Sequence, residues 1–183
     1  RWQVAITNTS TSPVELGDLA LPLPFNTDYV WDHDETFVRR VFKHAFIAGH
    51  GSFLYWLPVS GDGPMLLMLP VGGTHLEYFT AEGMDYAFGR ENFRVFVHSA
   101  ATGEQETRGT WRQPRTARRL APGERADYAF DLVWADSYAG LRDALYRHGG
   151  VDVTVAPGMV VPRDLEARLA LRTHHAIASI EAE

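Results

Sequence analysis

The residues best suited to chemistry crowd into one short segment, residues 32–52, with the sequence DHDETFVRRVFKHAFIAGHGS. This segment carries three acids, three bases and three histidines beside a run of apolar side chains. Acids and histidines are the side chains that most often perform acid–base catalysis and bind metal ions. The segment is therefore the first place to look for an active site, a metal site or a charged interface.

The histidines of this segment do not have the spacing of a metal site. Zinc-binding helices usually bring two ligands together from positions four residues apart. Here the intervals from His33 to His44 and from His44 to His50 are eleven and six residues. We therefore expect no metal and no cofactor, and we interpret the three histidines as exposed or hydrogen-bonded side chains.

The acids at the start of the segment have a structural interpretation as well as a catalytic one. A carboxylate pair for glycoside hydrolysis needs carboxyl groups roughly 5 to 9 Å apart, which most acidic loops could supply. Asp32 and Glu35 also form a capping box ahead of apolar residues with helical spacing. Against a helix, residues 36–38 suit a strand and the flanking sequence is rich in strand signals. The conformation of residues 36–47 stays open, with an irregular strand slightly favoured.

Two further motifs fail as catalytic or nucleotide-binding signatures. Ser52 follows Gly-His-Gly, but Leu54 stands where a nucleophile elbow has its second glycine. The glycine pairs at 72–73 and 149–150 are not followed by a phosphate-loop lysine. We interpret all of these glycines as turn or cap residues.

A second chemical signal lies in the polar stretch of residues 100–119, which is typical of a long surface loop. Trp111 lies there between Arg108 and Arg112. An exposed flat ring with polar partners is what stacking on a sugar needs. A tryptophan that covers a domain interface is equally compatible with the pattern.

The elements that must position these groups are mostly short strands separated by glycine and proline turns. Residues 53–69 predict a hairpin, and its second strand, residues 65–69, is apolar at every position. Such a strand is covered on both faces. Residues 128–134 alternate between apolar and polar, which indicates a half-buried strand. Three tryptophans on predicted strand faces are expected in the core: Trp2, Trp56 and Trp134.

One helix is predicted near residues 137–148, because Ser137 can cap it, apolar residues follow at helical spacing and Gly149 can end it. The predicted fold is therefore all-β, an antiparallel β-sandwich with one short helix. We expect residues 1–150 to form the sandwich domain. Residues 151–183 are expected to be linker strands that lead into a downstream domain, because the chain ends directly after a patterned segment.

The composition excludes several classes of partner. Hydrophobic residues at 45% and charged residues at 22% are ordinary for a globular chain, so no membrane association is expected. The net charge of −6 argues against nucleic-acid binding. The chain has no cysteine, which excludes disulfides and thiolate metal sites. Lys43 is the single lysine among 17 basic residues, a bias typical of GC-rich bacterial genomes.

Several segments together resemble a known group of proteins. They are NTS at 8–10, PVELGDLALPLPFN at 13–26, RRVFKHAFIAGHGS at 39–52, GTHLEYF at 73–79 and PGMVVP at 157–162. In combination they resemble the N-terminal region of a largely uncharacterised family of large, exported microbial proteins. That resemblance implies a β-supersandwich ahead of an (α/α)6 toroid, as in multidomain glycoside hydrolases.

The resemblance implies that the general acid lies in the toroid, so no catalytic residue is expected in this chain. We expect a non-catalytic domain, secreted or periplasmic, that packs against the catalytic domain of the same protein and lines its cleft for an oligo- or polysaccharide. A carbohydrate-binding module using Arg108, Trp111 and Arg112, a purely structural module and a free-standing enzyme with its site in residues 32–52 are the alternatives. The residues expected at the seam between the domains are Asp32, Asp34, Glu35, Arg39, Arg40, His44 and His50.

Overall fold

The computed structural model describes residues 1–25, 31–85, 90–105, 113–158, 160 and 162–181. Within these residues the chain forms twelve strands and three helices. The helices are α1 (His33–Arg39), α2 (Ala100–Gln105) and α3 (Tyr138–Arg147). The strands are β1 (Trp2–Thr7), β2 (Val14–Leu16), β3 (Asp18–Pro22), β4 (Val41–Phe46), β5 (Phe53–Pro58), β6 (Met65–Val71), β7 (Tyr78–Asp85), β8 (Arg90–Ser99), β9 (Arg118–Leu120), β10 (Arg125–Ala135), β11 (Asp152–Ala156) and β12 (Arg168–Arg172).

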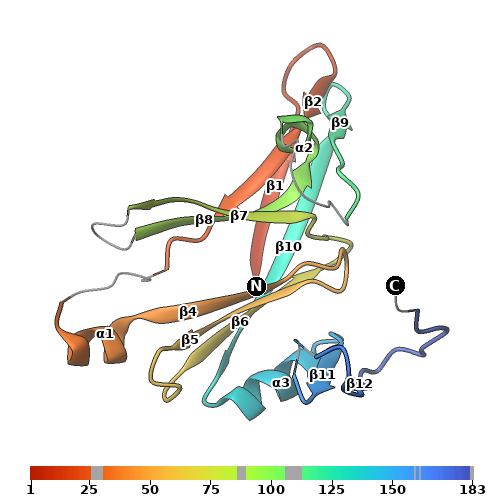
Figure 1. Ribbon diagram of the computed structural model, residues 1–183. Helices are drawn as coiled ribbons and strands as arrows, with labels where there is room; N and C mark the ends of the chain where they lie inside the picture. The colour runs from red at the N-terminus through yellow and green to blue at the C-terminus, as the bar shows by residue number, and fades with distance from the viewer. Residues whose placement is uncertain (26–30, 86–89, 106–112, 159, 161, 182–183) are drawn as a thin grey trace.

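Two antiparallel sheets pack face to face and confirm the predicted all-β sandwich. The larger has the strand order β1-β10-β6-β5-β4 and the smaller β3-β8-β7 (Figure 1). The core between them takes Leu21 and Val95 from the smaller sheet, and Leu54 and Phe130 from the larger. Two additional strand pairs, β2-β9 and β11-β12, lie outside these sheets.

Strand β6 occupies the centre of the larger sheet and contributes to two cores. Leu66 and Met68 point into the sandwich core. Leu67 and Leu69 point to the opposite face, where Leu141 of α3 packs against them. The expectation that this strand is covered on both sides is confirmed, because sheet covers one face and helix the other.

Helix α3 has the predicted bounds and caps. The Ser137 hydroxyl accepts a hydrogen bond from the Gly140 amide at 3.1 Å, and Gly149 ends the helix with a φ of 80°. That left-handed conformation favours glycine, since a side chain there would be strained. The described helices include none long and apolar enough to cross a membrane.

Residues 36–47 divide between the two conformations that the sequence left open. The Asp32 side chain accepts a hydrogen bond from the Glu35 amide at 2.9 Å and caps α1. The helix ends at Arg39, and β4 begins at Val41. The slight preference for an irregular strand was wrong for residues 36–39, where the cap and the ion pair between Glu35 and Arg39 stabilise a helix.

Two other local expectations need correction. Residues 100–119 are not one long loop, since α2 and β9 form at its two ends. Trp56 is buried as expected, but Trp134 is 68% exposed. Trp134 continues the face of Phe130, yet β1 begins opposite Phe130, so within the described residues β6 alone flanks Trp134 in the sheet. Regular alternation therefore predicted the strand correctly but not where its cover ends.

Leu67→Ala tests the double cover of β6. Leu67 is fully buried, so its truncation should lower the free energy of unfolding by about 3 kcal/mol through lost burial and a cavity. Leu132→Ala is the matched control, because Leu132 is 42% exposed and should cost less than about 1 kcal/mol. Urea denaturation followed by tryptophan fluorescence gives both values, and equal losses would contradict this packing.

Candidate functional site

Two glycine- and histidine-containing segments meet beyond the end of β4. Gly49 forms an isolated antiparallel bridge with Leu76, and the Leu76 amide donates to the Gly49 carbonyl at 3.2 Å. The buried Ser52 hydroxyl donates to the Gly49 carbonyl at 2.7 Å and accepts from the Ala48 amide at 2.9 Å. The Ser52 hydroxyl therefore stabilises this turn.

These two segments line a cavity of about 560 Å³ together with Gln113, Pro114 and Thr116. The polar side chains that line it are His50, His75, Glu77, Gln113 and Thr116.

Glu77 lines this cavity and is 3% exposed. Its carboxylate accepts hydrogen bonds from the Ser99 hydroxyl at 2.7 Å and the Thr116 amide at 3.0 Å, and contacts His75 Nε2 at 3.1 Å. The Thr116 hydroxyl donates to the same carboxylate. Burial alone would raise the pKa of Glu77, but these hydrogen bonds outweigh it and hold the pKa below its usual value.

His98 of β8 lies behind Glu77 and is 5% exposed. Its Nδ1 lies 2.7 Å from the Thr116 hydroxyl and its Nε2 lies 2.8 Å from the Tyr128 hydroxyl. Desolvation lowers the pKa of His98 in spite of the nearby Glu77 carboxylate. The imidazole is therefore a neutral hydrogen-bonding group near neutral pH.

The imidazole rings form a chain from the cavity mouth to the interior. His50 and His75 have ring centroids 5.3 Å apart, and His75 and His98 have centroids 6.0 Å apart. One ligand atom each from His75, Glu77 and His98 lies within 4.8 Å of the others. Imidazole and carboxylate groups arranged in this way can exchange protons or bind a metal ion.

This cluster was not predicted from the sequence, because the metal prediction rested on the spacing of the histidines in residues 32–52 alone. His75 and Glu77 are two positions apart in GTHLEYF, a spacing that places both on one face of extended backbone. His98 comes from another strand, β8, so local spacing cannot predict that it lies near His75 and Glu77. The alternation at residues 75–77 was the one sequence pattern that could have indicated this site.

Five of the predicted seam residues gather at the opposite end of β4, around α1 (Figure 1). Asp32 caps this helix and Asp34 lies in its first turn. Glu35 and Arg39 form an ion pair at 2.6 Å, and the Arg40 guanidinium lies 5.6 Å from the centroid of the Phe42 ring. Asp32, Glu35, Arg39 and Arg40 therefore each have a local partner or a capping position.

His44 lies apart from both groups, on the outer face of the larger sheet. Its ring stacks on Tyr55 with centroids 4.8 Å apart, and both line a cavity of about 120 Å³ beside α3. Desolvation lowers the pKa of His44. Desolvation first, and then a hydrogen bond with Tyr138, raises the pKa of Tyr55 to about 12.

The predicted site residues therefore lie in three places and do not form one surface patch. His50 joins the cavity of the histidine cluster, His44 joins the aromatic face, and the other five surround α1. Arg108, Trp111 and Arg112 lie outside the described residues, so the sugar-stacking platform stays a prediction.

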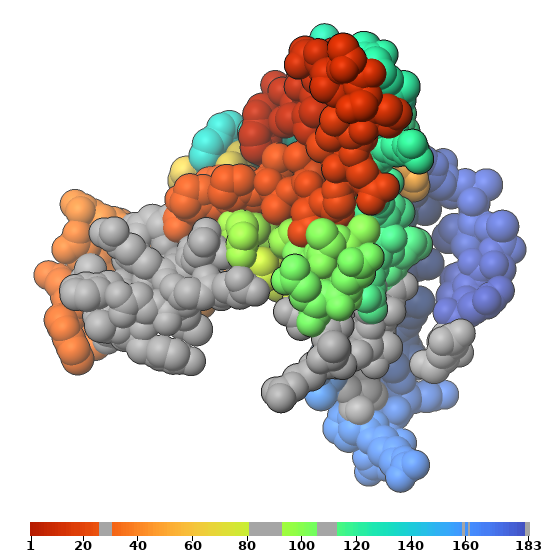
Figure 2. All heavy atoms as spheres, turned by 90° about the horizontal axis from the view of Figure 1, so that it is seen from above, coloured from red at the N-terminus to blue at the C-terminus, as the bar shows by residue number. Residues whose placement is uncertain are grey.

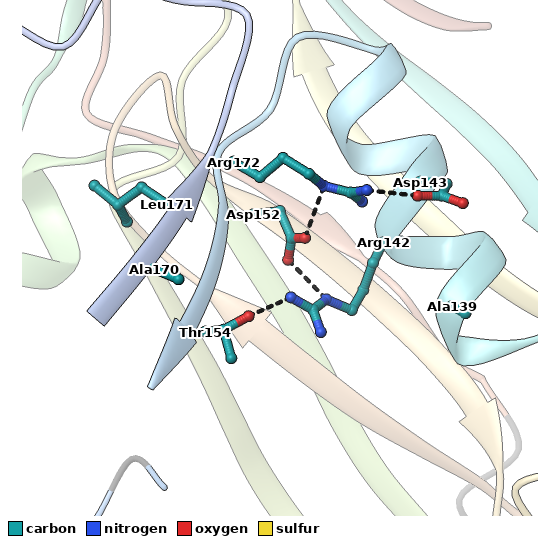
Figure 3. Close-up of a pocket in the computed structure, with 8 residues that line it drawn as sticks. All are labelled: Ala139, Arg142, Asp143, Asp152, Thr154, Ala170, Leu171 and Arg172. Atoms are coloured by element: carbon teal, nitrogen blue, oxygen red, sulfur yellow. Dashed lines mark hydrogen bonds and ion pairs between the residues drawn. The ribbon is translucent and has the colours of Figure 1, made fainter. Parts of the chain in front are cut away.

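A further cavity, of about 370 Å³, lies between α3 and the β11-β12 pair (Figure 3). Its acids and bases form one connected network. Asp152 receives Arg142 Nε at 2.9 Å and Arg172 Nε at 3.3 Å, and Arg172 also reaches Asp143 at 2.7 Å. Because these charges compensate one another, the network acts as a structural connection between β11-β12 and α3.

Comparison with known proteins agrees with the fold. A model of a family of unknown function, DUF5695, matches residues 1–183. A solved structure described as a polysaccharide lyase is similar with a TM-score of 0.63 at 18% identity. The similarity covers 84% of this chain and 21% of the lyase chain, so the chain spans about a fifth of the lyase's length. No curated protein matches significantly.

Glu77→Gln tests whether the buried carboxylate organises the histidine cluster. The amide keeps the size of the side chain but turns one acceptor into a donor that faces hydroxyl and amide donors. With metal ions removed by a chelator, so that only the protein's own hydrogen bonds are tested, we expect the free energy of unfolding to fall by about 2 kcal/mol. Exposed Glu15→Gln is the control and should change stability by less than about 0.5 kcal/mol. Indistinguishable urea midpoints for the two variants would contradict the proposed role of the carboxylate.

Proposed function

The chain belongs to the DUF5695 family, and from this starting point we propose that it is a non-catalytic β-sandwich domain of a polysaccharide-acting enzyme. The observation that carries the proposal is the similarity of its fold to part of a polysaccharide lyase. A likeness over 84% of this chain and 21% of the other fits one domain of a larger enzyme. The toroidal glycoside hydrolase context stays a prediction.

The contacts of the acids Asp32 and Glu35 at α1 support a role other than catalysis. Asp32 is committed to capping α1, and Glu35 is committed to an ion pair with Arg39. A retaining or inverting glycosidase needs two carboxyl groups that face a common substrate cleft. Capping and ion pairing explain these acids without such a cleft.

The surface of α1 supports contact with another domain. Phe37 is 53% exposed and Val38 is 70% exposed, and Phe42 at the start of β4 is 51% exposed. Figure 2 shows α1, in orange, at an outlying end of the molecule. An apolar surface with a charged rim is typical of a protein interface. We place the contact with the catalytic domain here, where the seam residues around α1 would border a glycan cleft.

An enzyme of this class meets its substrate outside the cytoplasm, and we accordingly propose that the protein is secreted or periplasmic. The proposed partner is a catalytic domain of the same protein. A polysaccharide would contact this chain only at the boundary between the two domains.

The first test is activity of the purified 183-residue chain on acidic and neutral polysaccharides. We expect neither unsaturated uronate products nor new reducing ends above the buffer control. Activity that disappears in Glu35→Gln or His44→Ala would instead establish a free-standing enzyme with its site in residues 32–52.

The second test is hydroxyl-radical labelling of phenylalanines in this chain and in the same chain joined to its downstream region. Labelling of Phe37 and Phe42 should fall several-fold in the longer protein because their rings become covered. Phe79 of β7, which is 39% exposed, is the matched control and should keep its labelling. Equal labelling of Phe37 and Phe42 in both proteins would contradict an interface at α1.

A further inference from the structure

We propose that His75, Glu77 and His98 form a binding site for a divalent transition metal ion, with zinc as the best-fitting ion. Two imidazole nitrogens and one carboxylate oxygen are a ligand set that zinc favours, whereas calcium and magnesium favour oxygen ligands. One ligand atom from each residue already lies within 4.8 Å of the other two. The inference is independent of the proposed domain role.

The distances require a small closure of the cluster. Zinc binds nitrogen and oxygen at about 2.0 to 2.2 Å, so two ligands of one ion lie no more than about 4 Å apart. His75 Nε2 and Glu77 Oε1 meet this limit at 3.1 Å. The widest separation must therefore shrink by less than about 1 Å. The His75 side chain, which is 28% exposed, has the freedom to make this movement.

The neighbours of His98 and Glu77 make hydrogen bonds that would orient these two side chains toward a metal ion. Metal-binding histidines almost always hold their second ring nitrogen in a hydrogen bond. The Tyr128 hydroxyl does this for His98, at 2.8 Å from Nε2, and leaves Nδ1 directed at the cluster. The Ser99 hydroxyl and the Thr116 amide both bind Oε2 of Glu77, at 2.7 and 3.0 Å, so Oε1 is the oxygen that faces His75.

Thr116 indicates where the ion would sit. Its hydroxyl contacts Oε1 of Glu77 and lies 2.7 Å from Nδ1 of His98. It therefore bridges two of the three atoms that the ion would bridge. Metal binding requires this hydroxyl to rotate away, and the backbone amide of Thr116 keeps its hold on Glu77 as that happens.

The cavity of about 560 Å³ gives the ion access and leaves room for a fourth ligand. Three protein ligands and one open position are the arrangement of zinc sites that bind water or a substrate group. The His50 ring lies at the same wall, 5.3 Å from that of His75. A water molecule can complete the tetrahedron from this side.

The test is metal titration of the chelator-stripped protein with zinc chloride by calorimetry, supported by the absorption spectrum of the cobalt(II) form. We expect one zinc ion per chain, a cobalt spectrum of tetrahedral type and a higher melting temperature. His75→Ala and His98→Gln should each weaken zinc binding at least about 10-fold. Excess magnesium or calcium should not compete.

His174→Ala is the matched control, since this histidine stacks on Tyr146 of α3 with ring centroids 3.9 Å apart and belongs to another part of the molecule. It should bind zinc as the unaltered chain does. His75→Ala removes a part-exposed ring, so it tests the site even where His98→Gln fails to fold. Absence of zinc binding, or binding equally strong in His75→Ala and His174→Ala, would overturn the proposal.

Discussion

The burial of β6 on both faces is the constraint on which the rest of the structure depends. A strand that is apolar at Met65–Leu69 cannot leave either face in water without exposing large apolar area. One face is closed by the smaller sheet across the sandwich core, and the other by α3. The smaller sheet and α3 therefore meet the same requirement from opposite sides of β6.

The sequence predicted best where a single pattern determines both the element and its surroundings. A continuous run of apolar residues predicted β6 and its burial on both faces, and a capping serine with a terminal glycine predicted the bounds of α3. At α1 the capping pattern was visible, but the strand-like residues Thr36-Phe37-Val38 competed with it. The hydrogen bond from the Glu35 amide to Asp32 and the ion pair between Glu35 and Arg39 favour the helix. Trp134 shows a different limit, because exposure there depends on where a neighbouring strand begins.

The candidate site was less predictable because it is assembled from distant strands. Glu77, His98 and Thr116 converge through the pairing of β7 with β8 and through the chain that returns after α2. A buried carboxylate demands hydrogen-bond donors, and here the donors come from positions up to 39 residues away. Donors so distant in the sequence cannot be predicted from local spacing. The two-residue spacing of His75 and Glu77 is local, so it could have indicated part of the cluster.

The network around Asp152 gives the C-terminal strands a kind of attachment that differs from that of the sandwich. Apolar burial holds the sheets together, but ion pairs tie β11 and β12 to α3. Arg172 and Asp143 are both well exposed, whereas Asp152 is sheltered beside Arg142. Dissolved salt screens the exposed Arg172–Asp143 pair more strongly than the sheltered Arg142–Asp152 pair, so the attachment depends on ionic strength mainly through its outer pair.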